Sequence, residues 1–356
     1  MRRFVLWVFA LCVLGGLGWA AYRLRDERQF ASTPFGEGAR LVVVPPGSGP
    51  HTLARQLSEA RVVSDERRFF VHMHYFRRGK QAKAGEYEFD GPVTPDEVLG
   101  KLIHGEVKLY RFTVPEGLRM DEIAGVVGAS GLCPSAEFLK LARDPATAKK
   151  LGVPASNLEG FLFPDTYSLS RGAGCLGTMQ VMVGRFQRAW QEAQKHRLPS
   201  LKLDELQAVT LASIIEKETG QPEERPRISC VFHNRLRKGI PLGTDPTVIY
   251  AVLLENDFVW DGNLHKSDLL RSHPYNTYRN KGLPPGPIAN PGQAALEAAL
   301  HPIACDDLFF VSRNDHTHVF CPNLKCHEAN VRKYQIDYFR RHKGSQGDRA
   351  AASQRR

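Results

Sequence analysis

One glutamic acid in an apolar helix is the best candidate for acid–base chemistry. Residues 203–219 have the pattern of a buried helix, with apolar side chains over most of its circumference. At roughly 100° of rotation per residue, Glu216 projects inside this apolar arc, whereas Glu218 lies about 160° away beside Gln207. Burial raises the pKa of a carboxyl group and keeps it protonated near neutral pH. We therefore predict Glu216 as a general acid, with an ion pair to an arginine such as Arg235 as the alternative.

A stiff loop further along the chain supplies side chains suited to binding a sugar. Residues 282–292 include four prolines, which fix backbone dihedral angles and remove hydrogen-bond donors. Tyrosine faces can pack on a sugar ring, and asparagine amides can bond hydroxyl and N-acetyl groups. A loop with a purely structural role is the alternative. The candidate side chains in and before this loop are Tyr275, Asn276, Tyr278 and Asn290.

Composition narrows the classes of partner and cofactor. The formal net charge of +10 favours an anionic neighbour, such as nucleic acid, lipid headgroups or an acidic polymer. The sequence has no zinc-finger, RNP or clustered basic-helix pattern, so we predict no nucleic-acid partner. It also has no HExxH, GxxxxGK(S/T) or GxSxG motif, so we predict no metal and no other cofactor.

Six of the seven cysteines lie outside the apolar N-terminal segment. An even number favours disulfide bonds in an oxidising compartment. The cluster of Cys305, Cys321 and Cys326 favours one local bridge, while the pairing of all six, which include Cys133, Cys175 and Cys230, stays open. A zinc site is an alternative for part of this cluster. Its ligands would be Cys321, Cys326 and His327 with His316 or His318.

The N-terminal segment predicts a membrane anchor. Residues 4–22 form an uncharged apolar run of 19 residues, close to the ~20 that a helix needs to span a bilayer. A cleaved signal peptide is the alternative, but its apolar region is shorter, and residues 19–22 make a poor cleavage site. We predict a short N-terminus at residues 1–3, the anchor at 4–22 and a polar linker at 23–39.

A repeated pattern follows the linker. Residues 41–44 predict a strand and residues 45–47 a turn, before a helical pattern; the strand and turn return 70 residues later at 112–117. The apolar helix positions keep this offset, from Leu53, Ala54 and Leu57 to Ile123, Ala124 and Val127. The turn and helix resemble LysM, a carbohydrate-binding module built as strand, helix, helix, strand. The alternative is an α+β domain with two similar βα units.

The second half of the chain predicts a mostly helical domain. Helical patterns cover residues 177–196, 203–219, 226–238, 247–256, 292–300 and 326–342, with short strands around 308–311 and 318–320. The fold class is therefore α+β. We predict an N-terminal transmembrane helix, a LysM-like α+β domain at 40–150 and a mostly helical α+β domain at 151–342 that holds the candidate acid. The polar, basic end predicts a disordered tail at 343–356.

Several segments, in order between residues 40 and 340, carry a specific pattern. They are LEGFLFPDTY at 158–167, LASIIEKET at 211–219, residues 232–250 with TDPTVIY at their end, YNTY at 275–278 and GLPPGPIANPG at 282–292. Together they resemble the MltG (YceG-like) family of endolytic murein transglycosylases. Gly243 departs from the pattern, because the family often has a longer polar residue there.

The resemblance implies roles for individual residues. Glu216 falls on the catalytic glutamate of the family, in agreement with the helix pattern. The implied substrate-binding residues are Asn234, Thr244, Asp245, Tyr275, Asn276, Tyr278 and Asn290. The implied supporting residues are Glu159, Asp165, Glu218 and Arg235.

The resemblance also implies a reaction and a location. Glu216 would protonate the glycosidic oxygen between N-acetylmuramic acid and N-acetylglucosamine, and the muramoyl C6 hydroxyl would attack C1 to leave a 1,6-anhydro end. This intramolecular attack needs no second carboxylate, unlike two-carboxylate hydrolysis. The implied location is the bacterial inner membrane with the catalytic domain in the periplasm, and the implied partners are peptidoglycan strands and peptidoglycan synthases. A non-catalytic peptidoglycan-binding scaffold and a hydrolytic muramidase are the alternatives.

Overall fold

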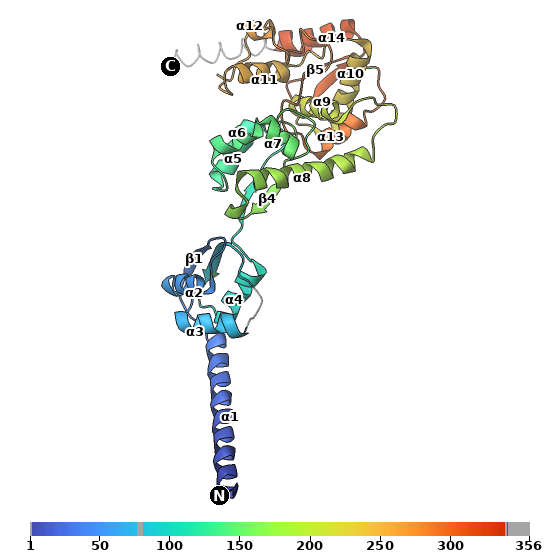
Figure 1. Cartoon of the computed structure of the whole chain (residues 1–356). Helices are drawn as coiled ribbons and strands as arrows, with labels where there is room; N and C mark the ends of the chain where they lie inside the picture. The colour runs from blue at the N-terminus through green and yellow to red at the C-terminus, as the bar shows by residue number, and fades with distance from the viewer. Residues whose placement is uncertain (1, 77–80, 339, 341–356) are drawn as a thin grey trace, which may run out of the picture. The chain divides into compact units, whose positions relative to one another are not determined.

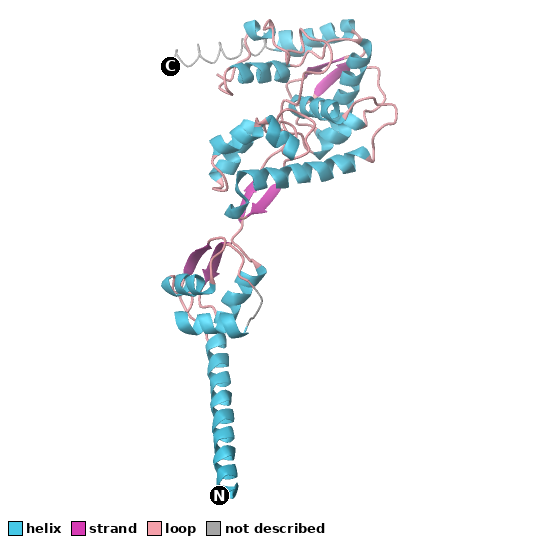
Figure 2. Cartoon of the chain, viewed as in Figure 1, coloured by secondary structure: helices cyan, strands magenta, loops and turns pink. Residues whose placement is uncertain are grey.

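The computed structural model describes residues 2–76, 81–338 and 340, which belong to two compact units (Figure 1). The first unit is Met1–Tyr110 with Ser168–Ala173, and the second is Arg111–Tyr167 with Gly174–Arg356. Helices predominate, and the described strands pair into three short two-stranded sheets (Figure 2). The α+β class is therefore confirmed. The division differs from the boundary predicted at residue 150, and the predicted tail at 343–356 lies outside the described residues.

The first unit begins with one long helix, α1 (Arg2–Ser32). Its length and apolar composition fit a membrane anchor or a signal sequence. The helix continues without a break into the unit, where Phe30 and Ala31 are each only 6% exposed. Arg68 donates to Asp26 over 2.9 Å beside them. The linker predicted at residues 23–39 is therefore wrong for residues 23–32, which are helical and end packed against the unit.

Two antiparallel strands and the helices around them form the rest of the first unit. β1 (Ala39–Val44) pairs with β2 (Gly85–Asp90) along its whole length. Between these strands lie α2 (Pro50–Glu59), α3 (Glu66–Val71) and a π-helix (His72–Phe76), and α4 (Pro95–His104) follows β2. Alternate side chains of β1, Val42 and Val44, are buried, as expected for a strand with one face on a core. The strand predicted at 41–44 is confirmed.

A second strand–helix–helix–strand segment follows. It consists of β3 (Tyr110–Thr113), α5 (Met120–Ala129), α6 (Ser135–Ala142), the short α7 (Pro145–Lys150) and β4 (Thr166–Leu169), with β3 paired to β4. The helix positions predicted as equivalent from the 70-residue offset are all buried, at no more than 2% exposure: Leu53, Ala54, Leu57, Ile123, Ala124 and Val127. The predicted repeat is confirmed as a repeat of core positions. The LysM likeness stays a prediction.

Helices dominate the remainder of the second unit. They are α8 (Gly174–Gln194), α9 (Glu205–Glu218), α10 (Arg225–Lys238), α11 (Asp245–Glu255), α12 (Lys266–Leu269), α13 (Gln293–Leu300) and α14 (Leu324–Val331), with a single turn at Pro222–Glu224. The hairpin of β5 (Phe309–Ser312) and β6 (His318–Cys321) precedes α14. The helix predicted at 326–342 is shorter as an α-helix, because a π-helix (Arg332–Ile336) follows Val331.

The helix with the two candidate carboxylates, α9, lies deep in this unit. Asp204 and Gln207 form a capping box at its start, which satisfies backbone donors of the first turn. Residues 208–215 are all buried, since α9 packs against its neighbours α13, α10 and α11. The helix ends at Glu218, where Thr219 takes an extended conformation. This end of α9 positions the candidate site.

Three disulfide bonds connect parts of the second unit. They are Cys133–Cys175, Cys230–Cys305 and Cys321–Cys326. The local bridge predicted within the C-terminal cluster is therefore confirmed as Cys321–Cys326. The zinc alternative is wrong, because both of its cysteine ligands are bonded to each other. Among the described residues, no group of three or more His, Cys, Asp or Glu side chains is arranged to hold a metal ion.

Candidate active site

A cavity of about 610 Å³ opens at the end of α9. Glu218 lies in its wall, together with Arg235 of α10 and Asp245 at the start of α11. Tyr278 lines it from the predicted sugar-binding segment, and Phe309 lines it from β5. The cavity therefore combines one carboxyl group on a buried helix with charged, aromatic and hydrogen-bonding neighbours, which is the composition of a ligand site.

Glu218 has the electrostatic character that the sequence analysis assigned to Glu216. Burial first, and then the negative charge of Asp245, raise the pKa of Glu218 to about 8 against the opposing positive charge of Arg235. Arg235 is fixed beside it, since its Nε donates to the Leu308 carbonyl and its Nη1 to the Leu242 carbonyl, both over 2.6 Å. A carboxyl group with this pKa holds its proton at neutral pH and can donate it.

Tyr278 and Asp245 form a pair inside the same cavity. The Tyr278 hydroxyl donates to Asp245 Oδ1 over 2.7 Å. Burial, and then this hydrogen bond to the carboxylate, raises the pKa of Tyr278. The structure therefore brings together five residues named in the sequence analysis: Glu218, Arg235, Thr244, Asp245 and Tyr278.

Glu216 lies in different surroundings, although it is only two residues away on α9. Its Oε1 accepts from Arg225 Nη2 over 3.1 Å, and its Oε2 accepts from the Gly292 backbone N–H over 3.0 Å. The Glu216 and Arg225 side chains are only 6% and 10% exposed. Glu116 lies 3.9 Å from Arg225, and burial together with the Glu216 charge raises the pKa of Glu116. The alternative given in the sequence analysis, an ion pair between Glu216 and an arginine, is therefore present in the structure. The arginine is Arg225, whereas the sequence analysis had suggested Arg235.

The three asparagines predicted to bind substrate are buried, and their side chains form hydrogen bonds within the protein. Asn276 and Asn290 are completely buried, and Asn234 is 4% exposed. The Asn276 amide donates to the carbonyls of Leu269 and Arg271, while the Asn234 amide donates to those of Cys305 and Asp307. Their amides have partners within the protein. The substrate-binding role predicted for them stays a prediction.

Asn290 belongs to a buried network centred on Glu159. Its Nδ2 donates to Glu159 Oε1 over 2.9 Å, and Tyr250 donates to Glu159 Oε2 over 3.1 Å. The Met120 backbone N–H also donates to this carboxyl group. Burial raises the pKa of Glu159 to about 8. These bonds tie the proline-rich loop to α5 and α11, and the supporting role predicted for Glu159 stays a prediction.

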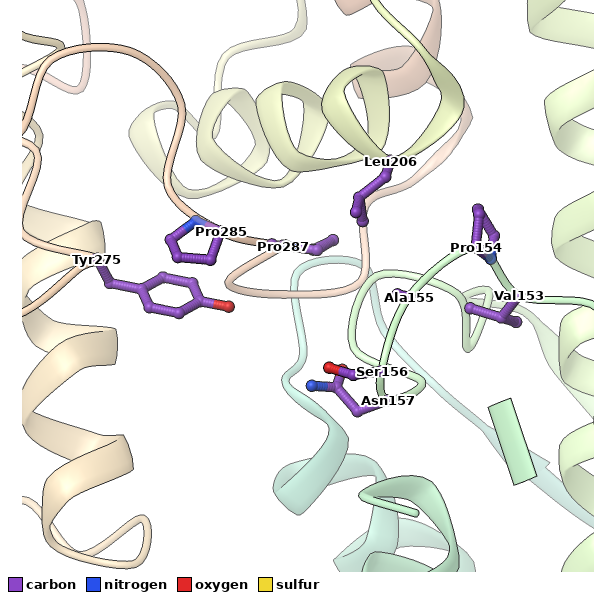
Figure 3. A pocket seen from close by; sticks show the side chains of 10 residues that line it. Val153, Pro154, Ala155, Ser156, Asn157, Leu206, Tyr275, Pro285 and Pro287 are labelled. Atoms are coloured by element: carbon purple, nitrogen blue, oxygen red, sulfur yellow. The ribbon is translucent and has the colours of Figure 1, made fainter. Parts of the chain in front are cut away.

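Two further predicted residues lie away from the Glu218 cavity. Asp165, directly before β4, accepts from Arg185 of α8 over 2.7 Å and does not line the cavity. Tyr275 lines a separate cavity of about 440 Å³ with Pro285, Pro287 and Leu206 (Figure 3). Burial raises the pKa of Tyr275 to about 12. The two tyrosines of the YNTY segment therefore face different cavities.

Sequence reasoning missed part of the cavity wall. Phe309, Phe310 and His327 come from the C-terminal hairpin and α14, and Glu218 was named only as a supporting residue. A helical wheel compares a residue with the others on its own helix, so it cannot register a wall built by other segments. The zinc hypothesis did single out His327, but for a different chemistry.

Comparison with known families identifies the chain's relatives. The model of the YceG-like family matches residues 42–333. The chain belongs to the YceG-like family. Similar proteins with established names include "Endolytic murein transglycosylase" of Bacillus subtilis, which is 31% identical over 82% of this chain and 83% of its own length. A protein of the same name from Streptococcus pneumoniae is 28% identical over 82% of this chain and 58% of its own length.

A solved structure supports the relationship. The crystal structure of a yceG-like protein from Listeria monocytogenes matches with a TM-score of 0.56 and 30% sequence identity. The match covers 82% of this chain and 98% of that one. The family assignment therefore rests on sequence and on fold.

Proposed function

We propose that this chain is a lytic transglycosylase that cleaves peptidoglycan strands internally, with Glu218 as its general acid and base. The observation that carries this proposal is the Glu218 carboxyl group, whose pKa is raised to about 8 in a cavity lined by Asp245, Tyr278 and Arg235. The two relatives named endolytic murein transglycosylase support the reaction class.

Protonated Glu218 would begin the reaction by donating its proton to the glycosidic oxygen, and the bond between C1 of N-acetylmuramic acid and this oxygen breaks. The C6 hydroxyl of the same muramoyl unit then bonds to C1, and its proton passes to the Glu218 carboxylate. The products are a free N-acetylglucosamine end and a 1,6-anhydromuramoyl end. No water is consumed, and Glu218 returns to its starting state.

The neighbours of Glu218 have distinct proposed roles. Arg235 offers a fixed positive charge that stabilises the Glu218 carboxylate formed in the middle of the reaction. Asp245 holds the Tyr278 hydroxyl, so the tyrosine ring presents a fixed face to a sugar. Asp245 is also the observation that favours the second candidate, a hydrolytic muramidase, because it is a second carboxylate in the same cavity.

The sequence predicted Glu216, and not Glu218, as the general acid. We prefer Glu218 because both carboxyl oxygens of Glu216 already accept hydrogen bonds, from Arg225 and from the Gly292 N–H, and Glu216 does not line the Glu218 cavity. In our proposal Glu216 anchors the end of the proline-rich loop to α9.

We also propose where the protein acts. In this proposal α1 is a single-pass anchor in the inner membrane, and both units lie in the periplasm next to peptidoglycan synthases. The first repeat is proposed to be a LysM-like domain that binds peptidoglycan strands.

Product analysis tests this function directly. Full-length protein in detergent would be incubated with purified sacculi, and the released fragments identified by mass spectrometry. Internal cleavage with 1,6-anhydromuramic acid ends supports the proposal, whereas reducing muramic acid ends indicate the muramidase. Binding of strands without any cleavage would indicate a non-catalytic scaffold.

A further inference from the structure

Two residues that line the Glu218 cavity each have one side-chain atom without a hydrogen-bond partner among the described residues. The atoms are Thr244 Oγ1 and His327 Nδ1, and both are buried. Other side chains in the described part of the chain also have such atoms, but these two residues alone among them line this cavity. Since a buried polar atom without a partner costs free energy, their shared position suggests that a bound ligand supplies the partners.

Thr244 is held so that only its hydroxyl group remains available. Its backbone N–H donates to Thr277 Oγ1 over 3.1 Å, and its carbonyl accepts from the Thr247 hydroxyl over 2.8 Å. The residue is 2% exposed, directly before α11. A hydroxyl group fixed in this way can donate one hydrogen bond to a carbonyl oxygen.

His327 offers the complementary group. Its ring stacks on Phe309, with the ring centroids 5.0 Å apart and the planes 22° from parallel. Burial lowers the pKa of His327, and the positive charge of Arg235 lowers it further, while Glu328 opposes both. The imidazole is therefore neutral at physiological pH, and in the tautomer with its proton on Nε2 the Nδ1 atom accepts a hydrogen bond.

We propose that Thr244 and His327 recognise the acetamido group of the sugar that occupies the cavity beside Glu218. An acetamido group has one acceptor, its carbonyl oxygen, and one donor, its N–H, which match the Thr244 hydroxyl and His327 Nδ1. Its methyl group is apolar, as are Ile240, Pro241 and Leu324 of the same wall. This pair is thus a specificity determinant that rejects strands whose amino groups lack the acetyl group, and it rests on the proposed function.

The test compares two substrates and matched variants of the full-length protein in detergent. The substrates are peptide-free glycan strands and the same strands after removal of their N-acetyl groups. We expect the unmodified protein to prefer acetylated strands in kcat/KM by at least about 100-fold, because a site built to bond a polar group discriminates strongly against its loss. Thr244→Val and His327→Phe should each reduce this preference at least about tenfold, mainly through KM on acetylated strands.

Conservative variants separate recognition from folding. Thr244→Ser keeps the hydroxyl and His327→Gln keeps an acceptor, so both should retain more of the preference than Thr244→Val and His327→Phe. His301→Gln, at an exposed residue outside the cavity, is the control and should change nothing. Melting temperatures of all variants would be measured together.

The outcomes separate this inference from the proposed function. Cleavage with the same acetyl preference in every variant overturns the inference and leaves the function intact. Absence of cleavage by the unmodified protein overturns the proposed function. In that case the affinities of the same two strands, measured by calorimetry, still decide the inference: a preference lost in Thr244→Val and His327→Phe but kept in Thr244→Ser supports it, and an unchanged preference overturns it.

Discussion

Glu216 and Glu218 lie on the same final turn of α9, yet Glu216 is bound to a guanidinium and Glu218 lines a cavity. Two residues along a helix differ in direction by about 160°, so the pair faces two sides of the helix. On one side Arg225 compensates the negative charge of Glu216. On the other side burial keeps the proton on Glu218. The helix therefore gives one carboxyl group a structural role and the other the properties of an acid.

Glu218→Gln should abolish cleavage. The substitution removes the only proton donor that our mechanism uses, and a group that serves as both acid and base contributes at least about 10³-fold. Strand binding should persist, because glutamine has nearly the same shape. The measurement is the rate of anhydromuropeptide release, with strand affinity as the control.

Glu216→Gln should act on stability more than on chemistry. It removes the nearer carboxylate of the buried Arg225 guanidinium and leaves only Glu116, whose Oε2 is 3.9 Å away, which costs about 3 kcal/mol. Denaturant unfolding at neutral pH measures this loss. If Glu216→Gln abolishes cleavage in a fully folded protein while Glu218→Gln does not, the assignment reverts to Glu216.

The alkaline limb of the pH–rate profile should report Glu218. The acid is active while protonated, and its pKa is raised to about 8, so kcat/KM should fall as the pH rises through about 8. A profile recorded from pH 5 to 10 checks this. A limb near pH 4–5, the ordinary range of a glutamate, would contradict the assignment.

The same shift predicts how stability depends on pH. A glutamate titrates near pH 4.3 in the unfolded chain, and Glu218 and Glu159 titrate near pH 8 in the folded protein. Between these values the folded state binds more protons, so the free energy of unfolding should decrease as the pH rises from about 4.3 to about 8. Urea unfolding at pH 5 and pH 8 measures it, and Glu218→Gln should make the dependence shallower.

Truncation should show that the folded part begins before residue 40. A protein lacking residues 1–22 keeps Phe30 and Ala31 in the first unit, whereas one lacking residues 1–39 loses both. Removing a buried phenylalanine costs about 3–5 kcal/mol of stability, so the protein lacking residues 1–39 should unfold at a lower temperature. Calorimetry compares the two, and Phe30→Ala in the longer protein is the matched control. Equal unfolding temperatures would contradict the packing of α1.

The bond between Cys230 and Cys305 should stabilise the second unit. It closes a loop across 75 residues, and a native bridge of this kind contributes about 2–5 kcal/mol. Replacing both cysteines with serine should lower the melting temperature, and cleavage should survive at low temperature because neither residue lines the Glu218 cavity. Replacing Cys321 and Cys326 should cost less, because their loop is short.

The sequence predicted secondary structure better than it predicted contacts between residues far apart along the chain. Strand 41–44 and the repeated core positions follow from local periodicity, so the structure confirms them. The linker prediction failed for residues 23–32 because charged residues there read as polar coil, although Asp26 is paired to Arg68 far along the chain. Such a pair leaves no local pattern.

The same limit applies to the candidate site. Tyr278 was named from the local tyrosine-rich segment and Asp245 from the family resemblance, and the two do share a cavity. Asn290 bonds to Leu118, Leu162 and Glu159, all far away along the chain. The cavity wall at His327 comes from α14, more than 100 residues after Glu218. These relationships exist only in the folded protein.

If α1 is the membrane anchor that we propose, its unbroken course has a mechanical consequence. Without a flexible hinge between the apolar helix and Phe30, the first unit must tilt and rotate together with the helix. A helix whose apolar length exceeds the hydrocarbon thickness of the bilayer relieves the mismatch by tilting. A thinner bilayer would therefore incline the whole first unit toward the membrane surface. Lipid composition, through bilayer thickness alone, would set the angle at which this unit meets its surroundings.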